Sequence, residues 1–416
     1  MKTIVVAGLN HETINACIFL ASLDWQVTLL ASADTLNALL SGYRFDKQVI
    51  LLWQLYVGEQ KITLVDSALE TYNKAQYYWL CFEALSSQDK KALPSLHFLP
   101  QSQVIITGAA NVGVIDALAE QLTTPWVYYL PLIFMKEGAN FNSFFHSDLI
   151  IIGEKTANST HKSALLQFFI SHSQKQRIAN IKTIEFGRMA IMGMLATRLS
   201  YINEMARLAD ELAVDIWAIQ AIMGADKRIG QDYLQAGWGF GGKSLPRELT
   251  ALIDAFSDKQ VDTALLQSVA RINNDQKELI FRKFWRYFNG FIDGKTVMIW
   301  GAAYRVGAGL STNSAIHPLL ALLWSYGIHT RVYAVHTQDE LKELYAKAYS
   351  EGQLSFTDNP YALEGCDGLF IINWNAKEQP DYQALNAYGV PIFDGKNVLN
   401  DTTIAQLAGF YTGIGR

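Results

Sequence analysis

The fold of this chain is decided by the stretch Ile4-Val-Val-Ala-Gly-Leu-Asn-His-Glu-Thr13 and by the way its pattern repeats. The apolar run Ile4–Ala7 has the length of a strand, Gly8 follows as a turn, and Thr13–Ser22 has the pattern of a helix. A continuous apolar strand is buried on both faces, which is typical of a parallel sheet covered by helices. The stretch therefore predicts the first unit of an α/β sheet.

The same alternation of strand and helix continues outward along the chain. Short apolar runs alternate with helix-length segments up to about residue 180, and the alternation returns from residue 294. Between these parts, residues 184–254 have helical periodicity, and Thr263 to Phe288 predicts one long helix. The order predicts two doubly wound parallel sheets joined by a helical region. The expected strands are Ile4–Ala7, Val27–Leu30, Tyr77–Phe82, Val104–Thr107, Trp126–Tyr129, Leu149–Ile152, Val297–Trp300, Thr330–Val335, Gly368–Ile372 and Pro391–Phe393.

The composition excludes several functional classes. The chain has 416 residues, of which 50% are hydrophobic, and a formal net charge of −5. This charge balance gives no basic surface for nucleic acid, and no apolar run reaches the roughly 18 residues that span a bilayer. The chain enters a strand directly, without the apolar segment and cleavage site of a signal peptide. We therefore expect a cytoplasmic protein that neither binds nucleic acid nor inserts into a membrane.

The cysteines and histidines have no metal-ligand spacing. Cys17, Cys81 and Cys366 are odd in number and far apart, so a disulfide framework is not expected. The histidines are scattered and lack the H-x-x-x-H pattern of a zinc site. We expect three small buried cysteines and no metal site.

Several motifs, in their order along the chain, resemble those of the UDP-glucose/GDP-mannose dehydrogenase family. The clearest is GWGFGGKSLPRE at residues 237–248, which is similar to the family's GFGGSCFPKD loop. The resemblance covers essentially the whole chain. It implies an N-terminal Rossmann-type NAD domain at 1–180, a central all-helical dimerisation domain with a long connecting helix at 181–290, and a C-terminal Rossmann-like UDP-sugar domain at 291–416. The other motifs are Phe134–Gly138, Ala196–Glu204, Arg228–Gly230, Asn273–Glu278, Asp394–Asn397 and Gly413–Arg416.

The NAD site that the resemblance implies is altered in this sequence. A Rossmann fingerprint carries three glycines, G-x-G-x-x-G, after its first strand. Gly8 keeps the first position, Asn10 replaces the second glycine, and Thr13 replaces the third. We expect Asn10 to form the turn in a left-handed backbone conformation and Glu12 to cap the helix as an anion. Cofactor binding by Gly8, Asn10 and Thr13 is therefore expected to be weak or absent.

Two further positions around the implied NAD site also differ. The second strand ends in Ala31, where the fingerprint has an acidic residue for the adenosine ribose, and Asp34 is a displaced substitute. The segment after the Tyr77–Phe82 strand places Glu83 near the expected cofactor cleft. These changes agree with a sheet that is kept for packing alone.

The catalytic positions implied by the resemblance are also replaced. The family oxidises a sugar alcohol to a carboxylate in two hydride transfers to NAD, through a thioester on cysteine. Ser244 stands at the cysteine, Arg188 at the active-site lysine and Glu248 at the water-activating aspartate. A serine hydroxyl is a weak nucleophile without a base, and arginine stays protonated at physiological pH. The family's asparagine, glutamate and threonine are replaced by Met192, Ile133 and Ala109.

The implied sugar-nucleotide site is better retained. Its glycines permit a close backbone approach and present N–H groups to a sugar, and Arg305 is suited to grip a phosphate. Lys396 stands where the family has an arginine, and Trp238 either fills a vacated pocket or stacks on a ligand. The run 308–314 lacks two acids and an arginine of the family. The expected substrate-binding residues are Phe134, Lys136, Glu137, Asn203, Arg228, Gly239, Phe240, Gly241, Gly242, Arg305 and Lys396.

Three hypotheses about function follow from these residues. The preferred one is an inactive dehydrogenase homologue that binds a sugar nucleotide or acts as a scaffold in surface polysaccharide biosynthesis. It forms a homodimer through its central helices, or pairs with an active paralogue or a polysaccharide-assembly protein. The second hypothesis is a working NAD-dependent UDP-glucose 6-dehydrogenase that makes a UDP-uronic acid. The third is a structural interaction module without a ligand.

Overall fold

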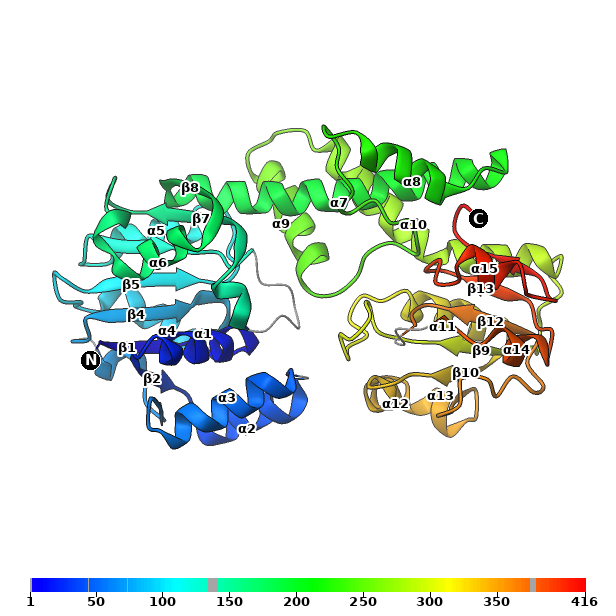
Figure 1. Ribbon diagram of the computed structural model, residues 1–416, viewed down its shortest axis with the longest axis horizontal. Helices are drawn as coiled ribbons and strands as arrows, with labels where there is room; N and C mark the ends of the chain where they lie inside the picture. Colours follow the sequence, from blue (N-terminus) through cyan, green and yellow to red (C-terminus); the bar gives the residue numbers. More distant parts are fainter. Residues whose placement is uncertain (1, 44, 73, 134–140, 375–378) are drawn as a thin grey trace. The chain divides into compact units, whose positions relative to one another are not determined.

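The computed structural model describes residues 2–43, 45–72, 74–133, 141–374 and 379–416 (Figure 1). The chain forms two compact units, residues 1–190 and residues 191–416. Each contains a sheet whose strands alternate with helices, so the expected α/β class with two Rossmann-like sheets and a helical region between them is confirmed.

The first unit is built on an eight-stranded sheet with the order β3-β2-β1-β4-β5-β6-β7-β8. The chain leaves β3 and returns on the other side of β1 as β4, so the sheet has a switch point between β1 and β4. All neighbouring strands are parallel except β6 and β7, which are antiparallel. The strands are β1 Thr3–Ala7, β2 Gln26–Leu30, β3 Ile62–Val65, β4 Tyr77–Cys81, β5 Gln103–Thr107, β6 Trp126–Tyr129, β7 Ser147–Glu154 and β8 Ser173–Asn180.

Helices cover both faces of this sheet, as the apolar strands require. In β4, Trp79 packs in one core cluster with Phe19, whereas Tyr78 packs in another with Tyr129. The helices are α1 His11–Ser22, α2 Ala33–Gly42, α3 Lys47–Gly58, α4 Ser87–Ala92, α5 Val114–Gln121 and α6 Ala164–Ser171. Short 3-10 turns span Leu69–Tyr72, Phe82–Ala84, Leu93–Ser95, Phe141–Phe144 and Thr160–Lys162.

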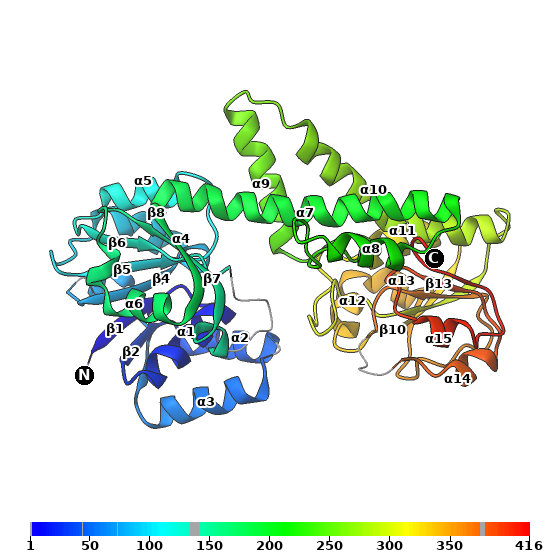
Figure 2. The same ribbon diagram turned by 45° about the horizontal axis from the view of Figure 1, so that its top comes forward.

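The second unit begins within the longest helix, α7 (Ile181–Leu212), and continues through helices α8 Ile216–Ala225, α9 Ser244–Asp258 and α10 Ala264–Tyr287. Figure 2 shows α8 alongside the later part of α7, where both contribute apolar side chains to one core. The end of α10 packs against the second sheet, because Phe284 lies 5.1 Å from Phe370 and 5.3 Å from Phe393, measured between ring centres. The expected long helix over Thr263 to Phe288 is confirmed.

The second sheet has six parallel strands in the order β11-β10-β9-β12-β13-β14. Its central strand β12 is fully buried and β9 is buried after its first residue, as expected from their apolar sequence. The strands are β9 Thr296–Trp300, β10 His329–Tyr333, β11 Leu354–Phe356, β12 Gly368–Ile371, β13 Ile392–Asp394 and β14 Tyr411–Thr412. The helices are α11 Ile316–Ser325, α12 Gln338–Leu344, α13 Ala346–Ser350, α14 Tyr382–Asn386 and α15 Asp401–Ile404.

Every expected strand is present, with ends that shift by a few residues. The sequence pattern missed β3, β8, β11 and β14. Strand β8 reads Ser-Gln-Lys-Gln-Arg-Ile-Ala-Asn and is largely exposed, so it has no apolar run to detect. The division into three domains at residues 180 and 290 stays a prediction.

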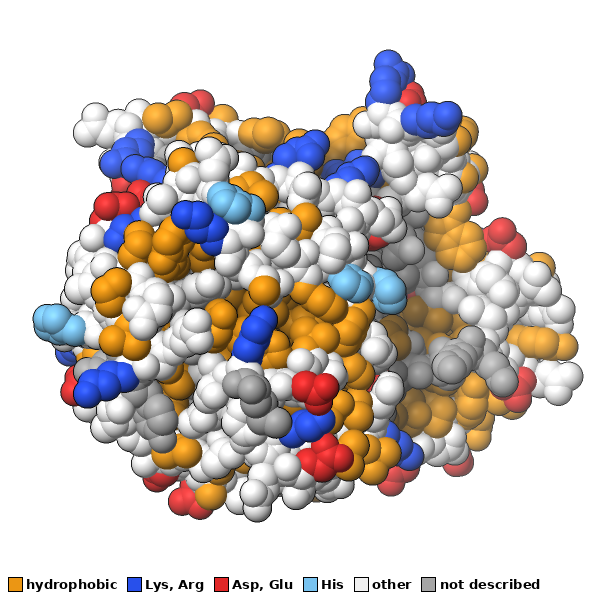
Figure 3. Space-filling view, turned by 60° about the vertical axis from the view of Figure 1, so that its left-hand side comes forward, with side chains coloured by type: hydrophobic (Ala, Val, Ile, Leu, Met, Phe, Trp, Pro, Cys, Tyr) orange, Lys and Arg blue, Asp and Glu red, His pale blue; other side chains and the backbone are white. Residues whose placement is uncertain are grey.

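On the face drawn in Figure 3, lysine and arginine side chains are scattered among other residues rather than gathered in one patch. Within the described ranges, no helix is both long and apolar enough to cross a bilayer.

Candidate functional site

The turn after β1 brings the chain very close to the end of β4. Gly8 has a φ of +89°, and a Cβ atom there would lie 2.4 Å from the carbonyl oxygen of Cys81. A side chain at this position would be both strained and in collision with backbone. Gly8 is therefore required for packing β1 against β4, whether or not a ligand binds.

Asn10 is the N-cap of α1, and the expectation of a left-handed Asn10 was wrong. Its backbone is extended, with a φ of −153°, and its Oδ1 accepts a hydrogen bond of 2.9 Å from the N–H of Thr13. An N-cap residue takes this extended conformation because its side chain must turn back to the first free N–H groups of the helix. Because of this cap, the N–H of Thr13 at the helix terminus is already hydrogen-bonded within the protein.

Thr13 closes the same turn from inside. Its hydroxyl lies 2.5 Å from the carbonyl oxygen of Gly8 and 2.9 Å from Oδ1 of Asn10, and the residue is fully buried. The polar β-branched side chain is thus accommodated by hydrogen bonds to the turn rather than by a gap. The side-chain amide of Asn10 also donates to the sulfur of Cys81 over 3.2 Å.

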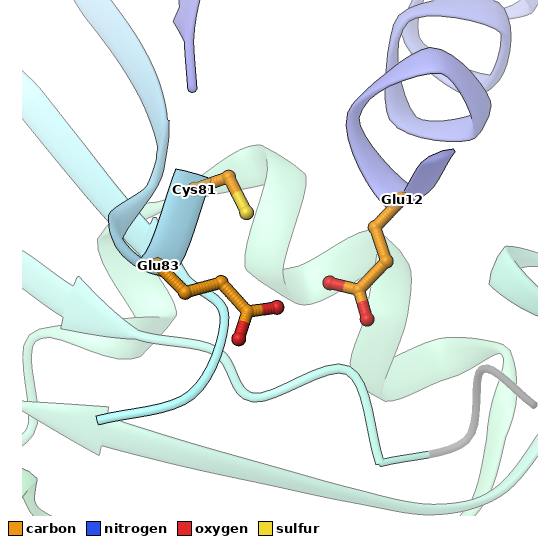
Figure 4. A group of neighbouring side chains, drawn as sticks. All are labelled: Glu12, Cys81 and Glu83. Carbon is orange, nitrogen blue, oxygen red and sulfur yellow. The ribbon is translucent and has the colours of Figure 1, made fainter. Parts of the chain in front are cut away.

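Glu12 lies in the first turn of α1, as expected of an anion there, but the N-cap of the helix is Asn10 rather than Glu12. Glu12 instead points from the first turn of α1 toward Cys81 and Glu83 (Figure 4). Their ligand-type atoms, two carboxylates and one thiol, all lie within 4.8 Å of one another. Burial, followed by the charges of the nearby Glu12 and Glu83 carboxylates, raises the pKa of Cys81 to about 12. The thiol is therefore protonated at neutral pH.

Sequence reasoning placed Glu83 near the expected cleft but missed this cluster as a unit. Glu12 and Cys81 are far apart in sequence and share no motif. The available signal was topological: Glu12 follows β1, and Cys81 and Glu83 follow the neighbouring β4 at the same edge of the sheet. The predicted ribose substitute, Asp34, lies exposed in the first turn of α2, which is capped by Ser32.

Arg188 lies on α7 within the first unit and is 9% exposed. One turn earlier, Glu185 accepts hydrogen bonds from the N–H groups of Gly113 at 2.8 Å and Ile115 at 2.6 Å. Glu185 thereby caps α5, whose N-cap Gly113 has no side chain, although burial raises the pKa of this carboxyl. Sequence reasoning missed this residue. The predicted substrate residues Phe134, Lys136 and Glu137 lie outside the described residues.

In the second unit, the glycine loop at 237–242 is held by side chains of α7 and α10. Asn203, 1% exposed, accepts the N–H of Gly237 at 2.9 Å, and Gln276 donates to the carbonyl of Gly237 at 2.8 Å. Asn273 accepts the N–H of Phe240 at 2.7 Å and donates to its carbonyl at 3.1 Å. The N–H of Phe240 and that of Gly237 are therefore already bonded within the protein.

The loop glycines are required by close contacts with the protein itself. A Cβ atom at Gly239 would lie 2.5 Å from Oδ1 of Asn273, and one at Gly242 would lie 2.6 Å from the ring of Tyr304. Gly242 also donates its N–H to the carbonyl of Thr312 at 2.8 Å. The expectation that the loop glycines present N–H groups to a sugar stays a prediction, although the N–H of Gly242 is already bonded within the protein. A Cβ atom at Gly241 would likewise lie 2.5 Å from the carbonyl oxygen of Asn313.

Trp238 is buried beneath this loop, with 1% of its surface exposed. Its indole N–H donates to the carbonyl of Ile372 at 2.9 Å, so its ring offers no face to a ligand in solvent. The half-buried Lys396 places its ammonium 5.5 Å from the centre of the indole ring. Burial lowers the pKa of Lys396, and the neighbouring Asp394 opposes that shift.

Ser244 is the first residue of α9 and is exposed. Among the described residues, no base lies within hydrogen-bonding distance of its hydroxyl. Glu248 is 3% exposed and accepts a hydrogen bond of 3.1 Å from Arg247. A hydroxyl without a base is a poor nucleophile, so this arrangement does not activate Ser244.

Arg228 faces solvent, with 88% of its side chain exposed, and pairs with Asp226 at 2.6 Å. The turn that carries it is held by Arg198, which sequence reasoning missed. Its guanidinium donates to the carbonyls of Ile229 at 2.8 Å and Gly230 at 2.9 Å. The fork of the guanidinium suits such convergent acceptors.

The two C-terminal motifs, Asp394–Asn397 and Gly413–Arg416, are joined by hydrogen bonds. Asn397, in a left-handed conformation, accepts the N–H of Ile414 at 2.8 Å and donates to its carbonyl at 2.9 Å. Asp394, fully buried, accepts the N–H of Val398 at 2.7 Å, and burial raises the pKa of its carboxyl. Arg305, half-buried, lies against Tyr304 in the loop after β9, with its guanidinium 5.7 Å from the ring centre.

Comparison with known proteins gives the relatives of this chain. Residues 182–275 match the family model described as UDP-glucose/GDP-mannose dehydrogenase family, central domain. The UDP-glucose 6-dehydrogenase of Pseudomonas aeruginosa is 33% identical over 289 residues, which cover 68% of this chain and 64% of that protein. The UDP-glucose 6-dehydrogenase YwqF of Bacillus subtilis is 30% identical over 292 residues, 68% of this chain and 63% of that protein. The matches thus span less than two thirds of these relatives' own length.

Solved structures share the fold over the full chain. A UDP-glucose dehydrogenase from the hyperthermophilic archaeon Pyrobaculum islandicum superimposes with a TM-score of 0.83 at 20% identity, covering 100% of this chain and 98% of that one. A UDP-D-ManNAc dehydrogenase from Pyrococcus horikoshii gives 0.79 at 17% identity, covering 100% and 99%. These structures show the fold alone, whereas the matched central region and the curated relatives show that the chain belongs to the UDP-glucose/GDP-mannose dehydrogenase family.

Proposed function

We propose that this protein binds a sugar nucleotide but neither binds NAD nor oxidises the sugar. The observation that carries the proposal is the closed turn between β1 and α1. There Asn10 takes the N–H of Thr13 for its own side chain, and Thr13 fills the space that a third glycine leaves open. A dinucleotide needs free N–H groups and a close backbone approach at this turn.

Charge at the same edge of the sheet supports the proposal. Glu12 and Glu83 bring two carboxyl groups beside Cys81, at the switch point where a doubly wound sheet holds its ligand. The diphosphate of NAD is an anion, and like charges at short range repel. These residues do not fit the family's cofactor.

The replaced catalytic positions point the same way. Ser244 is exposed without a neighbouring base in the described part of the chain, and Arg188 cannot exchange a proton near neutral pH. Loss of general acid–base groups alone typically reduces a rate by about 10²–10⁴-fold. Neither residue supplies what a covalent oxidation needs.

The retained features favour sugar-nucleotide binding. Lys396 and Arg305 are two half-buried cations in the second unit, and a half-buried cation attracts phosphate more strongly than a solvated one. Because the N–H groups of Gly237, Phe240 and Gly242 are already bonded, we assign recognition chiefly to these side chains. Phe134, Lys136, Glu137 and Arg228 remain proposed contacts.

We further propose that the domains correspond to residues 1–180, 181–290 and 291–416, and that the central helices form a homodimer. A cytoplasmic role beside an active paralogue or a polysaccharide-assembly protein fits a binding protein without turnover. Size-exclusion chromatography with light scattering tests the dimer, and cell fractionation tests the location.

A thermal-shift titration with NAD and with UDP-glucose tests the main proposal. A ligand at 100 times its dissociation constant adds about 2.7 kcal/mol of stability. We expect stabilisation by the UDP-sugar, none by NAD, and no NADH from both together. Stabilisation by neither would support an interaction module without a ligand instead.

An active UDP-glucose 6-dehydrogenase is the second candidate. The buried Glu248 favours it, because this carboxylate stands at the position of the family's water-activating group. Two curated relatives at 30% identity or above carry that activity in their names. NAD-dependent stabilisation together with NADH formation from UDP-glucose would establish it and refute the first proposal.

A further inference from the structure

A three-residue cluster at the edge of the first sheet has the character of a cation site. Glu12 comes from the first turn of α1, and Cys81 and Glu83 come from the end of β4, and their side chains point toward one another (Figure 4). One thiol sulfur and two carboxylate groups lie within 4.8 Å. Cys81 is fully buried, whereas both glutamates are half-buried, so the cluster has a closed floor and a polar rim.

A fourth polar group stands beside the cluster. Thr107 is the register partner of Cys81 on the neighbouring strand β5, and paired residues of parallel strands project to the same face of a sheet. Thr107 is fully buried, and the described residues offer its hydroxyl no hydrogen-bond partner. Such an orphaned buried hydroxyl is costly unless a water or ligand completes it.

Gly108 leaves room for the side chains of Glu83 and Cys81. Gly108, which follows Thr107, has a φ of +85°, and a Cβ atom there would lie 3.1 Å from Cγ of Glu83 and 3.3 Å from the sulfur of Cys81. Any larger residue would push against two of the three candidate ligands. The backbone is therefore shaped around this group of side chains.

We propose that Glu12, Cys81 and Glu83 bind a divalent transition-metal ion of the zinc class, with Thr107 hydrogen-bonded to a water molecule on that ion. A thiolate with carboxylates suits Zn²⁺ or Co²⁺, whereas Mg²⁺ prefers oxygen ligands alone. On binding, the S–H bond of Cys81 breaks, a sulfur–metal bond forms, and the proton passes to the buffer. The inference does not depend on the proposed function.

Titration of the chelator-treated full chain with Co²⁺ tests the site. We expect a thiolate-to-cobalt charge-transfer band in the near ultraviolet that saturates at one ion per chain. Excess Zn²⁺ should abolish the band, and the same excess of Mg²⁺ should leave it. The variant Cys81→Ser should lose the band, and Cys366→Ser, which changes a half-buried cysteine of the second unit, should keep it.

The variant Glu83→Gln removes one ligand charge with little change in shape and should weaken Co²⁺ binding by about tenfold or more. Circular dichroism of each metal-free variant checks the fold, and if Cys81→Ser fails to fold, Glu83→Gln and the Zn²⁺ competition still decide. No band in the unmodified protein would overturn the proposal. A band that survives in a folded Cys81→Ser variant would overturn it too.

Discussion

The side-chain amide of Asn10 donates to the sulfur of Cys81 over 3.2 Å, and this contact ties the β1–α1 turn to the end of β4. The oxygen of the same amide accepts the N–H of Thr13. One side chain thus uses both its donor and its acceptor at the switch point of the first sheet. Asn10 stands at a position that carries glycine in a dinucleotide fingerprint, and here its side chain links the β1–α1 turn to β4.

Replacement of Asn10 should destabilise the protein. Asn10→Ala removes the N-cap of α1, and loss of such a cap costs about 0.5–2 kcal/mol of unfolding free energy. Urea denaturation measures the change. Asn37→Ala on the exposed side of α2 is the control and should change stability by less than about 0.5 kcal/mol. Equal stability of both variants would mean that the cap contributes nothing.

Restoring the family's nucleophile should not restore turnover. Ser244→Cys supplies a thiol at the start of α9, but the β1–α1 turn remains closed and Arg188 remains protonated. We expect no NADH from UDP-glucose with NAD, measured by absorbance, under conditions in which an active family member is readily assayed. Turnover by this variant would show that the turn accepts NAD after all.

Gly242 should be intolerant of a side chain. Gly242→Ala combines a φ of +77° with a contact of 2.6 Å to the ring of Tyr304, and overpacking of this kind typically costs about 1–3 kcal/mol. The control is Gly187→Ala in α7, where nothing lies within 4 Å and alanine should stabilise the helix by about 0.5–1 kcal/mol. Thermal unfolding distinguishes the two. A neutral Gly242→Ala would contradict the packing explanation of the loop.

Lys396 should contribute to sugar-nucleotide affinity. Lys396→Met keeps much of the apolar stem but removes the ammonium beside Trp238. We expect about a tenfold weaker UDP-glucose affinity, equal to about 1.4 kcal/mol, by calorimetry. Lys347→Met, an exposed lysine on α13, should bind like the unmodified protein. If Lys396→Met also bound normally, Lys396 would have no part in the site.

Glu154 should make stability depend on acid pH. Burial of this carboxyl raises its pKa, but hydrogen bonds from Thr160, Asn158 and Ser159 outweigh burial and hold the pKa below its usual value of 4.5. A depressed pKa in the folded state adds stability above the unfolded pKa, and that stability is lost as the pH falls below about 4.5.

The variant Glu154→Gln should therefore be less stable at pH 7, by about 1.5–3 kcal/mol, and should lose less on acidification. Denaturation at pH 7 and at pH 4 measures both effects. Glu120→Gln, which changes an exposed carboxyl on α5, should behave like the unmodified protein at both pH values. Parallel loss of stability in Glu154→Gln and the unmodified protein would rule out this carboxylate as the source.

Much of the fold was predictable because it depends on local pattern. Strand β4 is fully buried, and β1 and β9 are buried after their first residue. All three are continuous apolar runs over their buried residues, and the pattern of α10 spans the whole helix. Strand β8 was not predictable, since its exposed polar residues pair only because β7 lies beside them. Strand β8 forms through its pairing with β7, and its own sequence has no strand pattern.

The site was predictable in position but less so in chemistry. The altered turn at Asn10 and Thr13 could be located from the missing glycines. Its conformation could not, because a left-handed turn and an extended N-cap both suit asparagine. Glu12 and Cys81 lie in one cluster although they are distant in sequence. The same is true of Asn273 and the glycine loop to which it is hydrogen-bonded. Only the pairing of strands and helices brings them together.

Calorimetric titration of NAD into the protein, with UDP-glucose already present, tests whether the turn between β1 and α1 excludes the cofactor. The closed turn and the two carboxyl groups at the switch point predict no saturable heat of binding. A saturable NAD isotherm, accompanied by formation of NADH, would contradict the account.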